Sequence, residues 1–163
     1  MRTRNRQIFI TLTLLSALLL FGLSGSEDAW AQSERLGYTN KLGGFGGVVQ
    51  ESSDFAAVIG VNYQWMFHED FGLGGLLEFS GGGVGRTWLI GVPFYFHTRS
   101  PLYFLVAPGI EFEDSDSDLF FRVGVGYEFA FNPRWSLVPA FNVDFVENDD
   151  TKFVYGFGVV YAF

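Results

Sequence analysis

The sequence contains no cysteine. This absence excludes a disulfide framework, a cysteine-ligated metal site and a lipid anchor attached through cysteine. Basic residues are also scarce, since 10 Lys and Arg stand against 18 Asp and Glu, and the formal net charge is −8. The few basic residues form no patch, so nucleic acid is not expected as a partner.

Long apolar runs are confined to the N-terminal segment, and none elsewhere approaches the roughly 20 residues that a spanning helix needs. Arginines at positions 2, 4 and 6 precede an apolar stretch from Ile8 to Leu23, and Ala29-Trp30-Ala31 follows it. A positive start, an apolar stretch and an A-x-A site are features of a secretory signal peptide. We therefore predict a cleaved signal peptide over residues 1–31 and one domain over 32–163. The alternative is an uncleaved anchor helix.

Phenylalanine and glycine are abundant, with 20 and 21 copies. Beyond the N-terminal segment, large and small residues alternate in short stretches that are separated by polar or glycine-rich residues. This period-two alternation predicts β-strands. Most of these stretches match the roughly 9–11 residues of a tilted membrane strand. Eight strands are predicted, over residues 40–49, 55–67, 71–81, 86–97, 102–113, 119–131, 135–146 and 152–163.

The two faces of the predicted strands differ in bulk and charge. In segment 119–131, one face is large and apolar from Phe121 to Phe131, and the other carries Gly124, Gly126 and two charges. Small residues fit the inside of a narrow closed sheet, and bulky aromatics fit its lipid-facing outside. Closure is required in lipid because an open edge would leave backbone groups unpaired. The pattern predicts an all-β fold, a closed antiparallel eight-stranded transmembrane up-and-down β-barrel. A soluble β-sandwich is the alternative, and the facing of segment 40–49 stays open.

An even number of strands places both chain ends on one side of the membrane. Because an exported chain enters the membrane from the periplasm, we predict that this is the periplasmic side. The turns at 68–70, 97–101 and 132–134 are then periplasmic. The loops at 51–54, 81–85, 113–118 and 147–150 then face outward, and three of these four are acidic.

With these features the chain resembles the small outer-membrane β-barrels of Gram-negative bacteria, the OmpA-like and OmpX-like barrels. The resemblance covers residues 32–163 and implies a monomer without cofactor in the outer membrane, in contact with its lipid and lipopolysaccharide. The chain end is similar to the C-terminal signal that barrel-assembly machinery recognises, carried by Phe157, Val159, Tyr161 and Phe163. One departure is that adhesins of this type carry long outer loops, whereas these loops are short.

Charges within the strands fall on the face that we predict to point inward. Buried charges must pair, because desolvation of a lone charge is costly. We therefore predict an ion-pair network that fills the lumen, and a gated narrow pore is the alternative. The residues of this predicted network are Lys41, Glu78, Glu111, Arg122, Glu128, Asp144 and Lys152.

One predicted outer loop carries acidic residues at nearly alternate positions, as loops that bind hard cations do: Glu113, Asp114, Asp116 and Asp118. A calcium hand needs Gly at its sixth position and Glu at its twelfth, and the chain has Leu and Val there. A solvated acidic loop is therefore favoured, and no metal site is predicted. Weak cation binding shared with lipopolysaccharide phosphates is the alternative.

Three prolines, Pro93, Pro108 and Pro139, fall inside predicted strands, where each removes a ladder hydrogen bond. We expect local bulges there. The alternative is a weakened seam at Pro93 and Pro108 that admits lipid sideways, as in barrels resembling the lipid A palmitoyltransferase.

The two histidines, His68 and His97, fall at predicted periplasmic turns, and His97 with Ser100 is no triad signature. We therefore predict no catalytic residues and a structural or surface-interaction role in the envelope. The alternatives are a narrow ion or small-solute channel and a lipid A-modifying or lipid-binding barrel.

Overall fold

The computed structural model describes residues 37–82, 85–113, 116–147 and 150–163. The predicted signal peptide lies outside these residues. Among the described residues, no helix is long and apolar enough to cross a membrane. The strands are β1 (Asn40–Glu51), β2 (Asp54–His68), β3 (Phe71–Gly82), β4 (Gly85–Gly91), β5 (Phe94–His97), β6 (Leu102–Glu113), β7 (Asp116–Tyr127), β8 (Phe129–Ala130), β9 (Trp135–Val146) and β10 (Lys152–Ala162).

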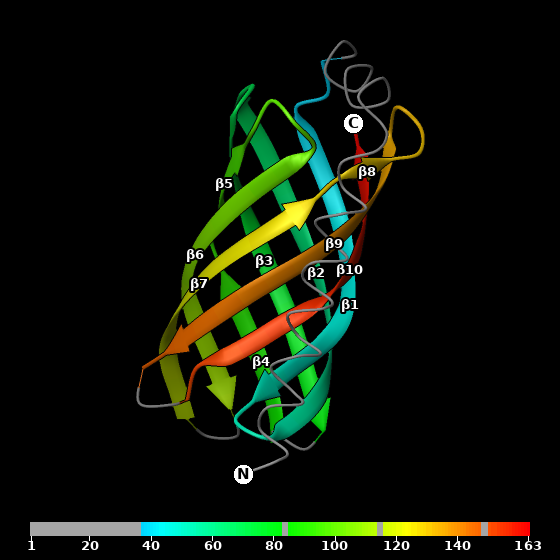
Figure 1. The fold of residues 1–163 in the computed structure, drawn as a ribbon. Helices are drawn as coiled ribbons and strands as arrows, with labels where there is room; N and C mark the ends of the chain where they lie inside the picture. The colour runs from blue at the N-terminus through cyan, green and yellow to red at the C-terminus, as the bar shows by residue number, and fades with distance from the viewer. Residues whose placement is uncertain (1–36, 83–84, 114–115, 148–149) are drawn as a thin grey trace.

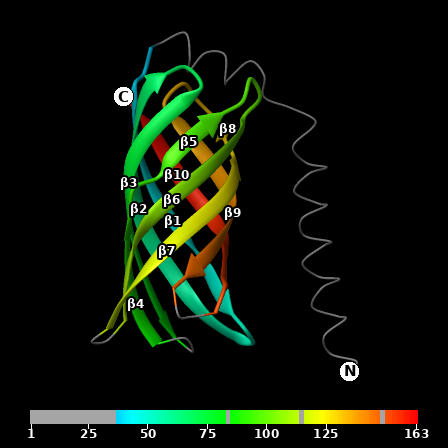
Figure 2. The ribbon, with the colours of Figure 1, turned by 90° about the vertical axis from the view of Figure 1, so that its left-hand side faces the viewer.

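The strands form one closed barrel (Figures 1 and 2). Every pairing is antiparallel, and the order around the wall follows the chain. The last strand, β10, pairs with both β9 and β1, which closes the sheet. β4 with β5, and β7 with β8, are single passes through the wall, each briefly interrupted. The prediction of a closed eight-stranded antiparallel barrel is therefore confirmed.

The expected bulges at the mid-strand prolines are wrong. Across Pro93 the register with β6 continues unshifted, from Gly91 opposite Gly109 to Phe94 opposite Val106. The physical reason is that a residue in an antiparallel ladder directs its N–H to one neighbour only, so a proline there removes one bond without adding a residue. The remaining bonds hold, since the Gly74 amide donates to the Pro93 carbonyl at 2.9 Å. Pro108 and Pro139 also lie in unshifted register.

The outside of the barrel is apolar, and side chains alternate between the two faces along each strand. For example, Ile59 is 64% exposed and Phe157 is 59% exposed. The first strand follows the same rule, since Leu42 is exposed and Lys41 is buried. The facing of this strand, which the glycine-rich sequence left open, is thereby determined.

Large inward side chains lie opposite glycines on neighbouring strands. Phe45 is opposite Gly158 on β10 and Gly60 on β2, and Phe120 is opposite Gly109 on β6. A Cβ atom on Gly109 would collide with the Phe120 ring. The glycines therefore make room for the few bulky groups that a narrow barrel can enclose. The same relationship joins Tyr103 with Gly126, Tyr95 with Gly72 and Asn142 with Gly124.

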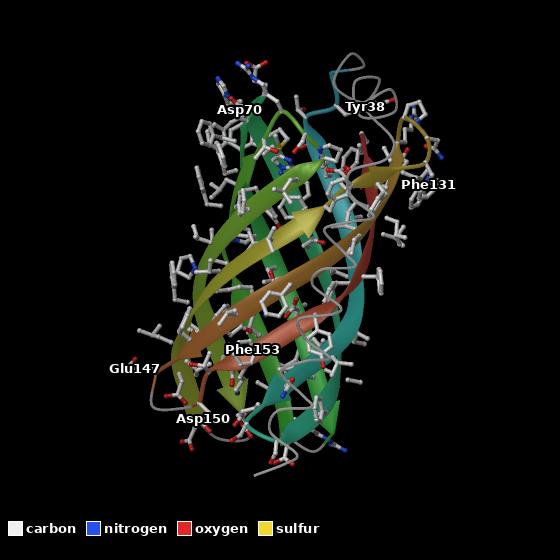
Figure 3. The ribbon with its side chains drawn as sticks, viewed as in Figure 1. Tyr38, Asp70, Phe131, Glu147, Asp150 and Phe153 are labelled. Carbon is white, nitrogen blue, oxygen red and sulfur yellow. The ribbon has the colours of Figure 1, made fainter. Side chains whose placement is uncertain are left out.

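The two ends of the barrel carry different residues (Figure 3). Tyr38, Asp70 and Phe131 lie at the end where the chain terminates, and Glu147 and Asp150 lie at the opposite end. The turn at Asp70 and the acidic residues Glu147 and Asp150 are thus separated by the height of the barrel. We call the end near Glu147 and Asp150 the acidic end and the other the terminal end.

Candidate functional site: the charged lumen

The seven strand charges singled out in the sequence all lie in the barrel interior. Their exposed fractions range from 2% for Arg122 and Asp144 to 6% for Lys41. They come from six passes of the wall, since Arg122 and Glu128 share the pass of β7 and β8, and the alternation along each pass turns every one of them inward. A side chain from one wall can therefore meet a side chain from the opposite wall.

Arg122 lies at the centre of the first cluster. Asp144 is its cross-strand neighbour on β9, and the guanidinium donates from Nε to Oδ1 at 2.6 Å and from Nη2 to Oδ2 at 2.7 Å. Glu78 comes from β3 and accepts two more bonds, from Nη1 at 2.9 Å and from Nη2 at 2.7 Å. The planar guanidinium thus makes paired hydrogen bonds to two carboxylates at once, the geometry in which arginine binds carboxylates most strongly.

Lys152 forms a second cluster of the same design. Its ammonium contacts Glu51, the cross-strand neighbour on β1, at 3.5 Å. It also donates to Glu111 from β6, on the other side of the lumen. A third cation, Lys41, lies toward the terminal end and donates to Glu128 at 2.7 Å, and Ser136 donates to the same carboxylate at 3.0 Å.

Very little space is left between the first two clusters. An interior cavity of about 20 Å³ lies among Glu78, Glu111, Arg122, Asp144 and Lys152. That volume is enough for about one water molecule. The seven buried charges comprise three cations and four carboxylates, so the interior carries an excess of negative charge.

Polar residues that the sequence reasoning missed fill the lumen between Arg122 and the terminal end. Asn62 donates to the Tyr95 hydroxyl at 3.3 Å, and Gln64 Nε2 lies 2.6 Å from His97 Nε2. Within the described ranges, Asn142 Oδ1 is the buried side-chain atom without a hydrogen-bond partner. Each of these residues shares the inward parity of the charges, so the alternation could have identified them.

The histidines have different surroundings. His68 is exposed at the end of β2, as expected for a turn residue. The expectation is wrong for His97, which is 2% exposed inside the barrel, because β5 continues to that residue and turns its ring inward between Tyr95 and Tyr103. Ser100 lies in the following turn, where its hydroxyl is 2.8 Å from Thr98 Oγ1. A lipid-modifying reaction at the outer wall would therefore not find His97 on the lipid-facing surface.

The acidic loop keeps three of its four predicted residues within the described ranges, and Asp114 lies outside them. Glu113 and Asp116 are directly opposite each other at the ends of β6 and β7. In the part of the chain that the structure describes, no group of three or more His, Asp or Glu side chains is arranged to hold a metal ion.

The predicted assembly signal lies on the outside of β10 and at the last residue. Phe157, Val159 and Phe163 are exposed, and Tyr161 packs on Trp135 with 4.8 Å between ring centroids. The Phe163 backbone exchanges hydrogen bonds with Asn40, at 2.8 and 3.1 Å, so the last residue takes part in closure.

Arg134 stands beside this strand at the terminal end, on the exposed turn between β8 and β9. Its guanidinium donates to the hydroxyls of Tyr38 at 3.0 Å and Tyr161 at 3.1 Å. Both bonds favour the charged form and raise the pKa of Arg134, and the bond to Tyr38 has the larger effect. The turn, the strand end and the residues before β1 are thereby joined.

No protein-family model matches the chain, and no curated protein matches it in sequence. Solved structures do match its fold. The N-terminal β-barrel domain of Pseudomonas aeruginosa OprF superposes with a TM-score of 0.60 at 14% identity, over 77% of this chain and 98% of that one. Neisserial surface protein A superposes with a TM-score of 0.61 at 13% identity, over 76% of this chain and 96% of that one.

Ail, the attachment invasion locus protein of Yersinia pestis, gives a TM-score of 0.52 at 16% identity, over 76% of this chain and 96% of that one. At such identities the likeness concerns the fold alone. The topology, the apolar exterior and these superpositions agree: the chain has the fold of the small eight-stranded outer-membrane β-barrels.

Proposed function

We propose that this chain is an outer-membrane barrel with a closed lumen, which serves the bacterial envelope through its wall and its outward rim. The observation that carries the proposal is the way each interior cation joins opposite walls. Arg122 links β7 to β3, Lys152 links β10 to β6, and Lys41 links β1 to the Glu128 position between β7 and β8. Side chains in these positions fill the cross-section, which supports a structural or surface role over free diffusion of solutes.

The rim at the acidic end supports a surface interaction. Asp54, Asp116, Glu147 and Asp150 are exposed there, on the side that we propose to face outward. A Yersinia pestis Ail structure contains the heparin analogue sucrose octasulfate, a polyanion. The rim of the present chain would repel such a ligand, so we propose a cationic partner or lipopolysaccharide bridged by divalent cations.

A deletion strain tests this role. Loss of the protein is expected to make the envelope permeable to a bulky antibiotic or a detergent, and the wild-type gene should restore resistance. A rim variant with Asp54→Asn, Asp116→Asn, Glu147→Gln and Asp150→Asn distinguishes the two forms of the proposal. Full rescue by this variant points to the wall alone, whereas failure with normal outer-membrane levels points to the charged rim. Unchanged resistance in the deletion strain would contradict an envelope role.

A narrow cation channel is the second candidate, and the excess of carboxylates over cations in the lumen favours it. A pore lined by net negative charge attracts cations and repels anions. Its signature would be a conductance whose reversal potential in a salt gradient lies near the value for cations. An anion-selective conductance would contradict the role of these carboxylates.

The two ends of the chain would serve export and assembly. Residues 1–31 would be removed on export, and Phe157, Val159, Tyr161 and Phe163 would mark the chain for the barrel-assembly machinery. The outward direction of three of these four side chains supports the second point, because a recognition signal must be accessible before the strand meets lipid. N-terminal sequencing of the outer-membrane protein tests the first, with Gln32 as the expected first residue.

A further inference from the structure

The outer wall carries an apolar groove of about 660 Å³ across β6, β7 and β9, near the acidic end. That volume falls in the roughly 300–1,000 Å³ range of ligand pockets. Its lining includes Val92, Pro108, Ile110, Leu119, Phe121 and Phe145. The groove faces away from the lumen, because its side chains have outward parity and are exposed.

The groove exists because one lateral row of the wall contains a small residue between large ones. Pro108 pairs with Phe121, and Phe121 pairs with Phe145, so the three lie side by side on neighbouring strands. The Val92 amide donates to the Pro108 carbonyl at 2.9 Å and extends the row to the β4–β5 pass. Pro108 is compact beside Phe121, so the surface is hollow between Val92 and Phe121. Gly109 acts on the inner side of the wall, where its missing side chain leaves room for the Phe120 ring.

The same place is a weak point in the ladder. Pro108 has no N–H to return to the Val92 carbonyl, and Pro93 has none for the Gly74 carbonyl. Two ladder bonds are therefore lost within one neighbourhood. The opening does not continue into the lumen, because the Phe120 ring packs behind Gly109 and is itself 3% exposed. Phe120 is in turn 6.0 Å from the Arg122 guanidinium, measured from ring centroid to carbon.

Charge and position indicate the occupant. The groove extends from Val92, where the β4–β5 pass is interrupted, to Glu147 at the acidic rim. Glu147 is the charged residue of the lining, and every other lining residue is apolar or glycine. In a membrane-spanning barrel, a groove of this direction accepts a hydrocarbon chain with its polar head at the Glu147 end. A carboxylate there favours a head group that carries an ammonium or donates hydrogen bonds.

We propose that this groove is a binding site for one acyl chain of a membrane amphiphile with an ammonium-bearing head. The site rests on the proposed membrane location and does not depend on the closed lumen or on the acidic rim's partner. Lipid stays on the outer wall, since Phe120 and the ion pairs behind it separate the groove from the interior. This differs from a sideways route into the lumen.

Native mass spectrometry of the full-length barrel released from detergent tests the proposal, with phosphatidylethanolamine as the probe. Ile110→Trp fills the groove. Ile59→Trp is the matched control, because Ile59 is exposed on β2 and does not line the groove. The wild type and the control should retain one lipid, and Ile110→Trp should retain it on the order of tenfold less, as expected when the contact of about two methylene groups is lost.

Two further measurements test the position of the site and its head-group preference. Phosphatidylethanolamine with a photoreactive acyl chain should label peptides of β6, β7 and β9, and even labelling around the barrel would overturn the site. Phosphatidylglycerol, whose head lacks the ammonium, should be retained less, and the reverse order would overturn the head-group assignment. Equal retention by Ile110→Trp and Ile59→Trp would overturn the groove while leaving the proposed envelope role unaffected. Both variants must first show the heat-dependent gel shift of a folded barrel.

Discussion

Arg122 and Glu78 meet across the lumen, with Arg122 Nη2 2.7 Å from Glu78 Oε2, although β4 and β6 separate their strands in the wall. Asp144, from the strand next to that of Arg122, holds the same guanidinium from the side. One cation thus satisfies a neighbouring and a distant carboxylate. Lys152 repeats this relationship with Glu51 and Glu111.

Removal of the central cation should be costly. Arg122→Ala would leave the Glu78 and Asp144 carboxylates buried without their partner and should lower the free energy of unfolding by about 3–5 kcal/mol. Urea unfolding in lipid vesicles measures this. The triple variant Arg122→Met, Glu78→Gln, Asp144→Asn should lose less, because no charge remains buried alone. A cost for Arg122→Ala no larger than that of the triple variant would contradict the ion-pair interpretation.

Interior glycines should be intolerant where they face a large side chain. Gly126→Val would bring its side chain into the Tyr103 ring, and we expect a loss of about 1–3 kcal/mol or more in unfolding free energy. Gly44→Val is the matched control, because a Cβ there meets nothing within 4 Å and points to lipid. Comparable losses for both variants would show that interior packing does not set the cost, because valine has the higher strand propensity at both positions.

Pro93 and Pro108 should leave the backbone amides of neighbouring residues less protected against hydrogen exchange. Pro108→Ala restores an N–H opposite the Val92 carbonyl, and hydrogen exchange of the Val92 amide should slow by on the order of tenfold, the effect of one ladder bond. Exchange measured by NMR in micelles tests this. Pro133→Ala, in the turn between β8 and β9, should leave Val92 unchanged. A shifted β4–β6 register in Pro108→Ala would contradict the unbulged ladder.

The last side chain should matter for assembly more than for the folded barrel. Phe163→Ala keeps the two backbone bonds to Asn40 and should fold normally in vesicles, yet reach the outer membrane in several-fold lower amount. The gel shift between unheated and boiled membrane fractions measures the folded amount in cells. Phe153→Ala, an outward aromatic at the other end of β10, is the control. Equal assembly of both variants would remove Phe163 from the proposed signal.

The alternation of residues predicted much of this architecture because a strand in a closed barrel has only two faces. Glu111, Arg122 and Asp144 could be assigned inward from parity alone. Their pairing could not, since Glu78 and Arg122 lie on strands that do not touch, and their meeting depends on the register of every strand between them. The position of His97 was missed because this last residue of the predicted strand 86–97 was assigned to the following turn, although it shares the inward parity of Tyr95.

The prolines were misjudged because a bulge was assumed to be their usual position in a sheet. Pro93 and Pro108 instead each give up one bond within an unbroken register, and the groove beside them depends on the compact Pro108 next to Phe121. A groove of this kind reflects which residues lie side by side across three strands, and a single sequence shows only neighbours along the chain.

Current through a planar lipid bilayer that contains the purified wild-type protein is the most direct test of the closed lumen. The ion pairs of Lys152, Arg122 and Lys41 lie in this order from the acidic end to the terminal end, and a cavity of about 20 Å³ lies between the first two. We therefore expect no steady single-channel conductance from folded barrels at moderate voltage. A stable, ohmic conductance from heat-shiftable wild-type protein would contradict the account and establish the barrel as a channel.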